Sequence, residues 1–299
     1  MIEGRLKARR TQPTAHPVIV IHRLKETVML EIENAVSETL LIPLYIKYLS
    51  SQQPDPILYD AAACRLIPQI EYDFSKFDHA YRSIAGTAIR AHYFDNMTAD
   101  FIRHRKNPVI VELGCGLDSR HERLGNRAGE APFYLLDLPD VIVLREKLLP
   151  PRAGETLIAA SAFDEEWMDN LLQSHPDAQF LFLIEGVLMY FPKENVRDLF
   201  QKLAQRFHGS EILFDVTSTW MTKVSDRHDA LKHTRARFAF GCDNDREPEL
   251  WAANLHMIAA KYLATDFPAW KKTGFFSYWI MRLFPPMRNS YRFLYYRVD

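Results

Sequence analysis

The spacing of hydrophobic positions along the chain changes near residue 108. Before it, apolar residues recur at helical spacing and predict three helical stretches, at about 25–48, 58–71 and 87–105. After it, short apolar runs alternate with helical stretches and predict strands near 109–113, 133–137, 156–160, 180–184, 211–216, 263–267 and 291–298. Repeated strand-helix units predict an α/β fold with a mostly parallel, doubly wound sheet and an antiparallel closing strand, preceded by helices without strands.

This pattern divides the chain into three parts. Residues 1–20 are basic and poor in apolar groups, and Ile2-Glu-Gly-Arg5 matches a protease recognition sequence of expression vectors, so we expect a disordered tail or a cloning remnant. Residues 21–106 are expected to form an N-terminal helical cap. Residues 107–299 then form the core, with a polar, charge-dense insertion at about 218–260 as a lid.

Composition narrows the range of partners. The 299 residues carry a formal net charge of -1, so no basic excess points to nucleic acid as a partner. The three cysteines have no Cys-X-X-Cys pairing, which favours a reducing cytoplasm and predicts neither a disulfide framework nor a metal site. No apolar run reaches the roughly 18 residues of a membrane span, so no membrane partner is expected.

The turn after the first of these strands carries the candidate chemistry. Gly114 and Gly116 lack the Cβ that would hold a ligand away from the backbone, and Glu112 lies at the carboxyl end of the strand, where open parallel sheets bind ligands. The next strand ends at Asp137, whose carboxylate is suited to accept hydrogen bonds from ribose hydroxyls. We therefore expect a cofactor that contains a nucleoside.

Two cofactor classes fit a strand, a glycine turn and an acid in this order. A nicotinamide dinucleotide needs a third glycine where its pyrophosphate meets a helix, but Ser119 occupies that position and Asp118 adds a carboxylate beside it. S-adenosyl-L-methionine carries no phosphate, so this pattern favours it.

Four segments together resemble the leucine carboxyl methyltransferase superfamily, in its tetracenomycin polyketide O-methyltransferase-like branch. They are Val-Ser-Glu-Thr-Leu-Leu-Ile-Pro-Leu-Tyr at 36–45, Tyr-Asp-Phe-Ser-Lys-Phe at 72–77, Leu-Gly-Cys-Gly-Leu-Asp-Ser-Arg at 113–120 and Glu-Gly-Val-Leu-Met-Tyr at 185–190. The resemblance implies a Rossmann-like class I methyltransferase fold. It also implies S-adenosyl-L-methionine as methyl donor and S-adenosyl-L-homocysteine as product.

The resemblance also implies roles for single residues. Arg90 would reach the methionine carboxylate of the cofactor. The family usually places a small acidic or polar pair against the adenine, but here Asp164 lies one place later, so Ala162 and Phe163 would instead supply a backbone contact and an apolar wall. Glu185 would lie beside the methionine end, holding the amino group or compensating the sulfonium charge. Tyr190 would point its hydroxyl toward the transferring methyl group, which makes Glu185 and Tyr190 the candidate catalytic residues.

The predicted function is an O-methyltransferase whose partner is a small-molecule acceptor, a polyketide-like phenol or a carboxylic acid. Two alternatives stay open: a protein C-terminal carboxyl methyltransferase, and a protein that binds the cofactor without catalysis. A phenol with a pKa near 10 benefits from a general base, whereas a carboxylate is already ionised at pH 7. Four histidines are candidate bases, none fixed by a motif: His79, His92, His233 and His256.

Overall fold

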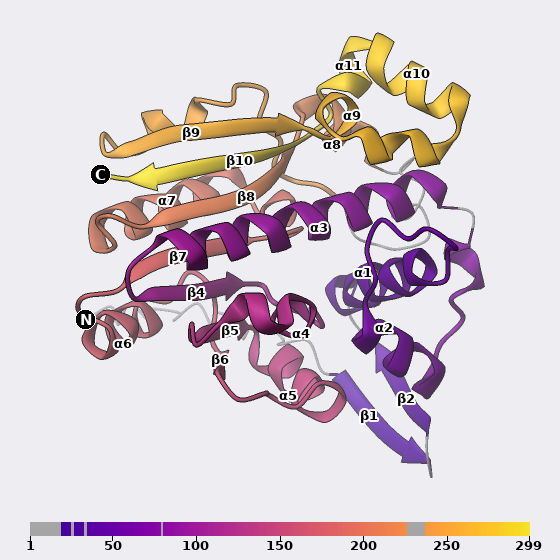
Figure 1. The fold of residues 1–299 in the computed structure, drawn as a ribbon, viewed down its shortest axis with the longest axis horizontal. Helices are drawn as coiled ribbons and strands as arrows, with labels where there is room; N and C mark the ends of the chain where they lie inside the picture. The colour runs from indigo at the N-terminus through magenta and orange to yellow at the C-terminus, as the bar shows by residue number, and fades with distance from the viewer. Residues whose placement is uncertain (1–18, 25–26, 33–34, 79, 226–236) are drawn as a thin grey trace, which may run out of the picture.

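The computed structural model describes the chain except for residues 1–18, 25–26, 33–34, 79 and 226–236. Its centre is a seven-stranded sheet of order β6-β5-β4-β7-β8-β10-β9 (Figure 1). In chain order the strands are β4 (Pro108–Leu113), β5 (Phe133–Asp137), β6 (Glu155–Ala159), β7 (Gln179–Ile184), β8 (Glu211–Thr217), β9 (Leu255–Tyr262) and β10 (Tyr291–Val298).

Strand direction confirms the predicted fold class. The strands β4 to β8 pair in parallel, whereas β10 runs antiparallel to both of its neighbours, β8 and β9. The last strand along the chain is therefore inserted between two earlier ones. This is a Rossmann-like, mostly parallel sheet with an antiparallel closing strand.

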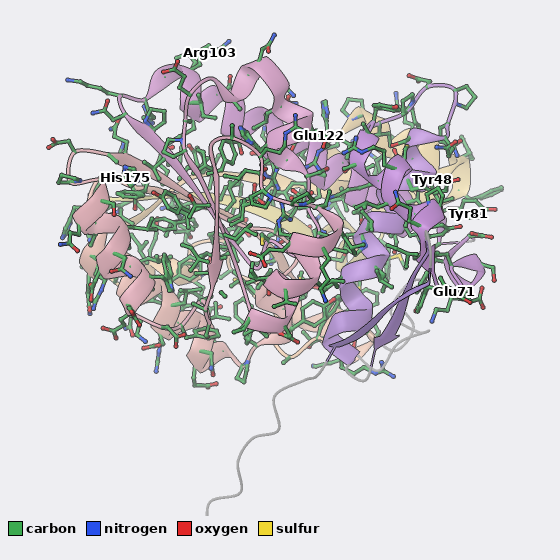
Figure 2. All side chains as sticks on the ribbon, turned by 90° about the horizontal axis from the view of Figure 1, so that it is seen from below. Tyr48, Glu71, Tyr81, Arg103, Glu122 and His175 are labelled. Carbon is green, nitrogen blue, oxygen red and sulfur yellow. The ribbon has the colours of Figure 1, made fainter. Side chains whose placement is uncertain are left out.

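Helices cover both faces of the sheet because successive strand residues point to opposite sides. Val109 and Val111 pack in the core under α6 (Glu166–Ser174) and α7 (Lys193–Arg206). Ile110 faces the other way, into a core shared with α3 (Tyr81–His104), α4 (Arg120–Leu124) and α5 (Pro139–Leu148). The long helix α3 runs from Tyr81 at one end of the molecule to the exposed Arg103 (Figure 2).

The expectation of an N-terminal part without strands is wrong. An antiparallel hairpin of β1 (Ile19–Leu24) and β2 (Thr27–Ile32) comes first, and β3 (Ile70–Glu71) pairs in parallel with β2. The helices α1 (Ala35–Ser51) and α2 (Ala61–Leu66) follow the hairpin and separate it from β3. The helical spacing of apolar residues ran across the boundary between β2 and α1, while the β-branched residues of both hairpin strands favour extended backbone. The tail expected at residues 1–20 lies outside the described residues up to position 18.

A second expectation also fails near the C-terminus. Residues 263–267 were expected to form a strand, but α9 (Leu263–Asp266) occupies that position and β9 ends just before it. An edge strand with one solvated face contains polar residues among the apolar ones. The exposed His256 and Lys261 interrupt the apolar run of β9, so the sequence did not predict a strand there. The closing strand predicted at 291–298 is confirmed as β10.

Short helices stand above the carboxyl ends of the strands. They are α8 (Thr219–Lys223), a 3-10 helix at Pro268–Thr273, α10 (Phe275–Leu283) and α11 (Pro285–Arg288). Together with α1 and α9 they roof the end of the sheet where the site lies (Figure 1). Among the described residues, no helix combines the length and the apolar character needed to cross a bilayer.

Candidate functional site

The described residues enclose a large cavity at the carboxyl ends of β4, β5 and β7. Its volume is about 1380 Å³, which exceeds the roughly 300–1,000 Å³ of a typical small-molecule pocket and leaves room for two ligands. All nine site residues predicted from the sequence line it: Arg90, Glu112, Gly114, Gly116, Asp137, Ala162, Phe163, Glu185 and Tyr190. Asp118, from the same glycine turn, lines it as well.

The glycine turn is required by contacts within the protein. Gly114 has a φ of +74°, and a Cβ there would lie 2.4 Å from Cγ2 of Val187. At Gly116, with a φ of +48°, a Cβ would lie 3.0 Å from Cδ2 of Leu40. The amide of Gly114 donates back to the carbonyl of Leu136 on β5 at 2.8 Å. The turn is thus folded tightly against its neighbours and exposes bare backbone to the cavity.

Asp137 closes β5 with its carboxylate already oriented. One carboxylate oxygen accepts a hydrogen bond from the amide of Gly116 at 2.7 Å, and the other accepts one from the amide of Leu138 at 2.8 Å. Burial raises the pKa of this carboxyl to about 6, against the opposing effect of these two amides. Each oxygen keeps a lone pair for a hydroxyl donor in the cavity.

Arg90, on α3, is held by three partners at the base of the cavity. Its Nε donates to Glu185 at 2.9 Å, and its Nη1 donates to Asp215 at 3.0 Å and to the hydroxyl oxygen of Tyr291 at 2.6 Å. The Tyr291 hydroxyl in turn donates to Asp215. Nη2 faces Gly186, where a Cβ would lie only 3.0 Å away. Arg90 is therefore fixed in position by its protein partners.

Sequence reasoning missed Asp215 and Tyr291. Asp215 lies in the middle of an apolar run in β8 and is fully buried, so a carboxylate within a buried strand was the available signal. Its second oxygen accepts a hydrogen bond from the amide of Gly186 at 2.7 Å. Tyr291 begins β10 and carries no local motif that could have identified it.

Arg120 is a third missed residue, and it links four carboxylates, one of which is Asp118, 3.2 Å from its Nη2. Its Nε donates to Glu112 at 2.9 Å, its Nη1 to Asp95 at 2.7 Å and its Nη2 to Glu185 at 2.6 Å. Burial raises the pKa of Glu112 to about 7, although Arg120 opposes the shift. Burial acts in the same direction on Glu185, but Arg90 and Arg120 outweigh it and hold the pKa of that carboxyl below its usual value.

This network of ion pairs continues to Asp118. Arg123 donates to its carboxylate at 2.8 Å, and Lys47 forms a second ion pair with it. Asp118 is buried, yet Arg123, Lys47 and Arg120 hold the pKa of its carboxyl well below the usual range. The connected carboxylates are Asp60, Asp95, Glu112, Asp118, Glu185 and Asp215, and the connected cations are Lys47, Arg90, Arg120 and Arg123. Because carboxylates outnumber cations, this buried cluster favours a ligand that carries positive charge.

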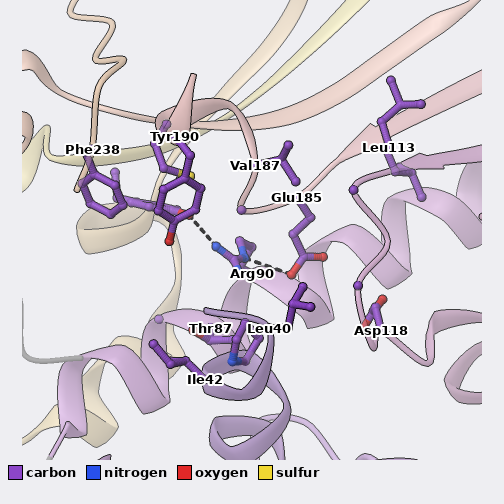
Figure 3. A pocket seen from close by; sticks show the side chains of 18 of the residues that line it. Leu40, Ile42, Thr87, Arg90, Leu113, Asp118, Glu185, Val187, Tyr190 and Phe238 are labelled. Atoms are coloured by element: carbon purple, nitrogen blue, oxygen red, sulfur yellow. Dashed lines mark hydrogen bonds and ion pairs between the residues drawn. The ribbon is translucent and has the colours of Figure 1, made fainter. Parts of the chain in front are cut away.

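Tyr190 and Phe163 contribute aromatic walls at different places. Phe163 follows β6, its ring meets Phe191 edge-on at 4.9 Å, and its carbonyl accepts a hydrogen bond from Lys202 at 2.9 Å. The Tyr190 ring lies 5.7 Å from that of Phe238. Figure 3 shows Tyr190 and Phe238 on one side of Arg90 and Asp118 on the other. Burial raises the pKa of Tyr190 to about 12, so its hydroxyl keeps its proton at neutral pH.

The candidate histidine bases do not join the site. His92 is exposed on α3 and pairs with Asn96, and His256 lies half-exposed on β9 beside Asp299. His79 and His233 fall outside the described residues. No histidine is found among the described residues that line the cavity.

Comparisons with known proteins match this architecture. A family model for leucine carboxyl methyltransferase matches residues 41–204. The chain is 30% identical to the tetracenomycin polyketide synthesis O-methyltransferase TcmP of Streptomyces glaucescens, over 87% of this chain and 96% of that protein. It is 26% identical to the S-adenosyl-L-methionine-dependent methyltransferase dpfgK of Gibberella zeae, over 82% of this chain and 88% of that protein.

A solved structure shares the fold. It is a DUF574 family protein from Streptomyces avermitilis, which superposes with a TM-score of 0.53 at 14% identity and covers 89% of this chain and all of that one.

Proposed function

Because the chain belongs to the leucine carboxyl methyltransferase family, we propose that it transfers a methyl group to an oxygen of a small, largely apolar acceptor. It is a methyltransferase, and its methyl donor is S-adenosyl-L-methionine. The acceptor class and the residue roles below are part of the proposal.

The residues of the cavity fit this cofactor. The turn at Gly114 and Gly116 presents backbone without side chains, and Asp137 offers the acceptors that two ribose hydroxyls need. Ala162 and Phe163 would then face the adenine. Each of these five positions lies on the part of the cavity next to β4, β5 and β6.

The methionine end would lie over the ion-pair network. The Nη2 atom of Arg90 would bind the cofactor carboxylate, while Glu185 and Glu112 would face its ammonium and sulfonium groups. The excess of carboxylates supports this orientation because the cofactor carries two positive charges and one negative charge at this end. When bound, the cofactor supplies an electrophilic methyl group on sulfur.

The observation that carries the proposed acceptor class is the lining of the cavity on the side of β8 and β10. The loop after β7, the segment after β8 and the two helices before β10 supply Tyr190, Trp220, Met221, Phe238, Met281 and Met287. This lining is apolar and aromatic, which suits a flat or hydrophobic acceptor and excludes water from the reacting atoms. Tyr190, protonated at neutral pH, would donate a hydrogen bond to the acceptor oxygen.

Methyl transfer is an in-line displacement, so the protein mainly aligns the acceptor oxygen with the methyl group. A phenol would also have to lose a proton to a base. Since no described histidine lines the cavity, the acceptor we propose is a carboxylic acid, which is already ionised at pH 7 and needs no base.

The experiment has a binding step and a turnover step. Calorimetry with S-adenosyl-L-methionine and with S-adenosyl-L-homocysteine should show binding of both. Turnover is then followed as release of S-adenosyl-L-homocysteine with aromatic carboxylic acids, polycyclic phenols and peptides with a free C-terminus. Methylation of carboxylic acids supports the proposal. Methylation of peptides alone would replace it with the protein C-terminal activity, and binding without turnover on any acceptor would favour a non-catalytic role.

A further inference from the structure

The outer surface of α10 and the residues after it exposes an unusual concentration of large apolar side chains. Phe275, Phe276 and Leu283 are 73%, 80% and 71% exposed. Trp279, Ile280 and Phe284 are exposed as well. These six residues lie within ten positions of the chain, and they are half of the twelve large apolar side chains that are exposed among the described residues. The other six are spread along the chain between Tyr59 and Ile258. We call the six residues at 275–284 the apolar patch.

The apolar patch is flanked by positive charge. Lys271 and Arg288 precede and follow it in the sequence, and both are exposed and form no ion pair with a described residue. Two further cations of this segment have partners within the protein: Lys272 pairs with Asp55, and Arg282 donates to the carbonyl of Thr265. From 267 to 298 the sequence contains no Asp or Glu. The surface is thus both aromatic and cationic.

The same helices have an inner face that belongs to the cavity. Met281 of α10 is buried, Met287 of α11 is partly buried, and both line the cavity. In Figure 1, α10 and α11 stand at the edge of the molecule, beyond the ends of β9 and β10 and away from the sheet. The apolar patch is therefore the outside of the cavity roof.

We propose that α10 and α11 dock this protein on the surface of an anionic lipid bilayer. The aromatic side chains of the apolar patch enter the boundary between headgroups and acyl chains, and Lys271 and Arg288 meet anionic headgroups. A helix of nine residues is too short to span, so α10 lies in the plane of the interface. This inference departs from the expectation that the chain has no membrane partner, and it does not depend on the acceptor class.

Charge favours a bilayer over a second copy of the chain as the occupant. In a two-fold dimer, the same patch faces itself, which brings Lys271 and Arg288 of one copy close to those of the other without an acidic partner in the segment. An anionic bilayer instead attracts the positive charges and buries the aromatic side chains at the same time.

The test is flotation of the full chain with lipid vesicles. Vesicles of phosphatidylcholine with a minor fraction of phosphatidylglycerol should carry the protein, and pure phosphatidylcholine or high salt should carry much less. The double variant Phe276→Ser, Leu283→Ser should lose binding about tenfold or more. The variant Lys271→Glu should weaken binding to the anionic vesicles. The matched control, Leu250→Ser with Ile258→Ser, removes exposed apolar side chains elsewhere and should bind as the unmodified protein does.

A second readout follows the tryptophan in the apolar patch. Trp279 is 43% exposed, so anionic vesicles should shift its emission to shorter wavelength, and Trp279→Phe should remove this change. Calorimetry with S-adenosyl-L-homocysteine checks that the serine variant is folded, and it separates a failure of docking from a failure of the proposed cofactor site.

Three results would overturn the proposal. One is an absence of flotation with anionic vesicles at low salt, and another is equal flotation of the serine variant and its control. The third is a lipid-free dimer, seen by analytical ultracentrifugation, that the serine variant abolishes while vesicles carry neither form. That outcome would assign the apolar patch to an interface between copies.

Discussion

The Nη1 atom of Arg90 lies 2.6 Å from the hydroxyl oxygen of Tyr291, although 201 positions separate the two residues in the sequence. The contact joins α3, which packs on one face of the sheet, to the first residue of the closing strand β10. Both residues line the cavity, and both also contact the fully buried Asp215. The same three side chains therefore stabilise the fold and shape the site.

Replacing Arg90 by Met should destabilise the protein strongly. The change leaves Glu185 and Asp215 buried without this cation, and breaking a buried ion pair typically costs about 3–5 kcal/mol of the free energy of unfolding. Guanidinium denaturation measures the loss. Arg103→Met on the same helix is the control, because that side chain is 70% exposed and its pair with Asp100 should contribute at most about 1 kcal/mol. Equal stabilities of the two variants would contradict this account of the network.

Gly114→Ala should cost more stability than the same change at Gly209. Both glycines have a φ near +75°, so both variants carry similar backbone strain. A Cβ at 114 also meets Val187 at 2.4 Å, whereas nothing lies within 4 Å of a Cβ at 209. Thermal unfolding should rank the variants in this order. Val187→Ala should recover part of the loss in the Gly114 variant, and a lack of any recovery would argue against the steric cause.

The stability of the protein should depend on pH through Asp137. Burial raises the pKa of its native carboxyl to about 6, above the ordinary value of 3.8. Between about pH 4 and 6, the native state therefore holds a proton that the unfolded chain has released, and this contribution to stability falls as pH rises. Denaturation of the unmodified protein and of Asp137→Asn over this range isolates the effect. Parallel stability curves would show that the carboxyl titrates normally.

Glu185→Gln should weaken binding of S-adenosyl-L-methionine more than binding of S-adenosyl-L-homocysteine. The proposed role of Glu185 includes compensation of the sulfonium charge, and the product lacks that charge. Calorimetry with both ligands gives the ratio of the two losses. Glu211→Gln is a matched control, since Glu211 is buried and ion-paired with Arg105 but does not line the cavity. Equal losses for both ligands would show that Glu185 does not compensate the sulfonium charge.

Tyr190→Phe should lower kcat by about tenfold while leaving the affinity for the methyl donor unchanged. The substitution keeps the ring beside Phe238 and removes one hydrogen bond to the acceptor oxygen. Steady-state kinetics with an acceptor found in the turnover panel measures the effect. Tyr59→Phe, at an exposed position away from the cavity, serves as control. A change in donor affinity alone would place Tyr190 in the cofactor site instead.

The residues that sequence analysis located share a local signal. Gly114, Gly116 and Asp137 come directly after apolar strands, and the carboxyl ends of parallel strands converge on one edge of the sheet. The order of residue types along the chain was therefore enough to predict that these residues share one site. The same local reasoning also identified the parallel strands of the core.

Asp215, Tyr291 and Arg120 could not be located in this way. Their partners are distant in sequence or on different elements, so their importance arises from pairings that only the assembled fold creates. The hairpin β1–β2 was missed for a related reason. Its strands are set by their pairing with each other, whereas the apolar spacing into α1 mimicked a continuous helix.

The insertion of β10 between β8 and β9 imposes an order of events during synthesis. A chain is made from its N-terminus, and domains generally begin to fold in that direction. Yet β9 has no neighbour in the sheet other than β10, and Tyr291 reaches Arg90 only when β10 is in place. A nascent chain that ends before residue 291 therefore has both an unpaired edge on β8 and an unfinished site. Capacity to bind the cofactor should consequently arise late, as a single step, when the ribosome has released the closing strand.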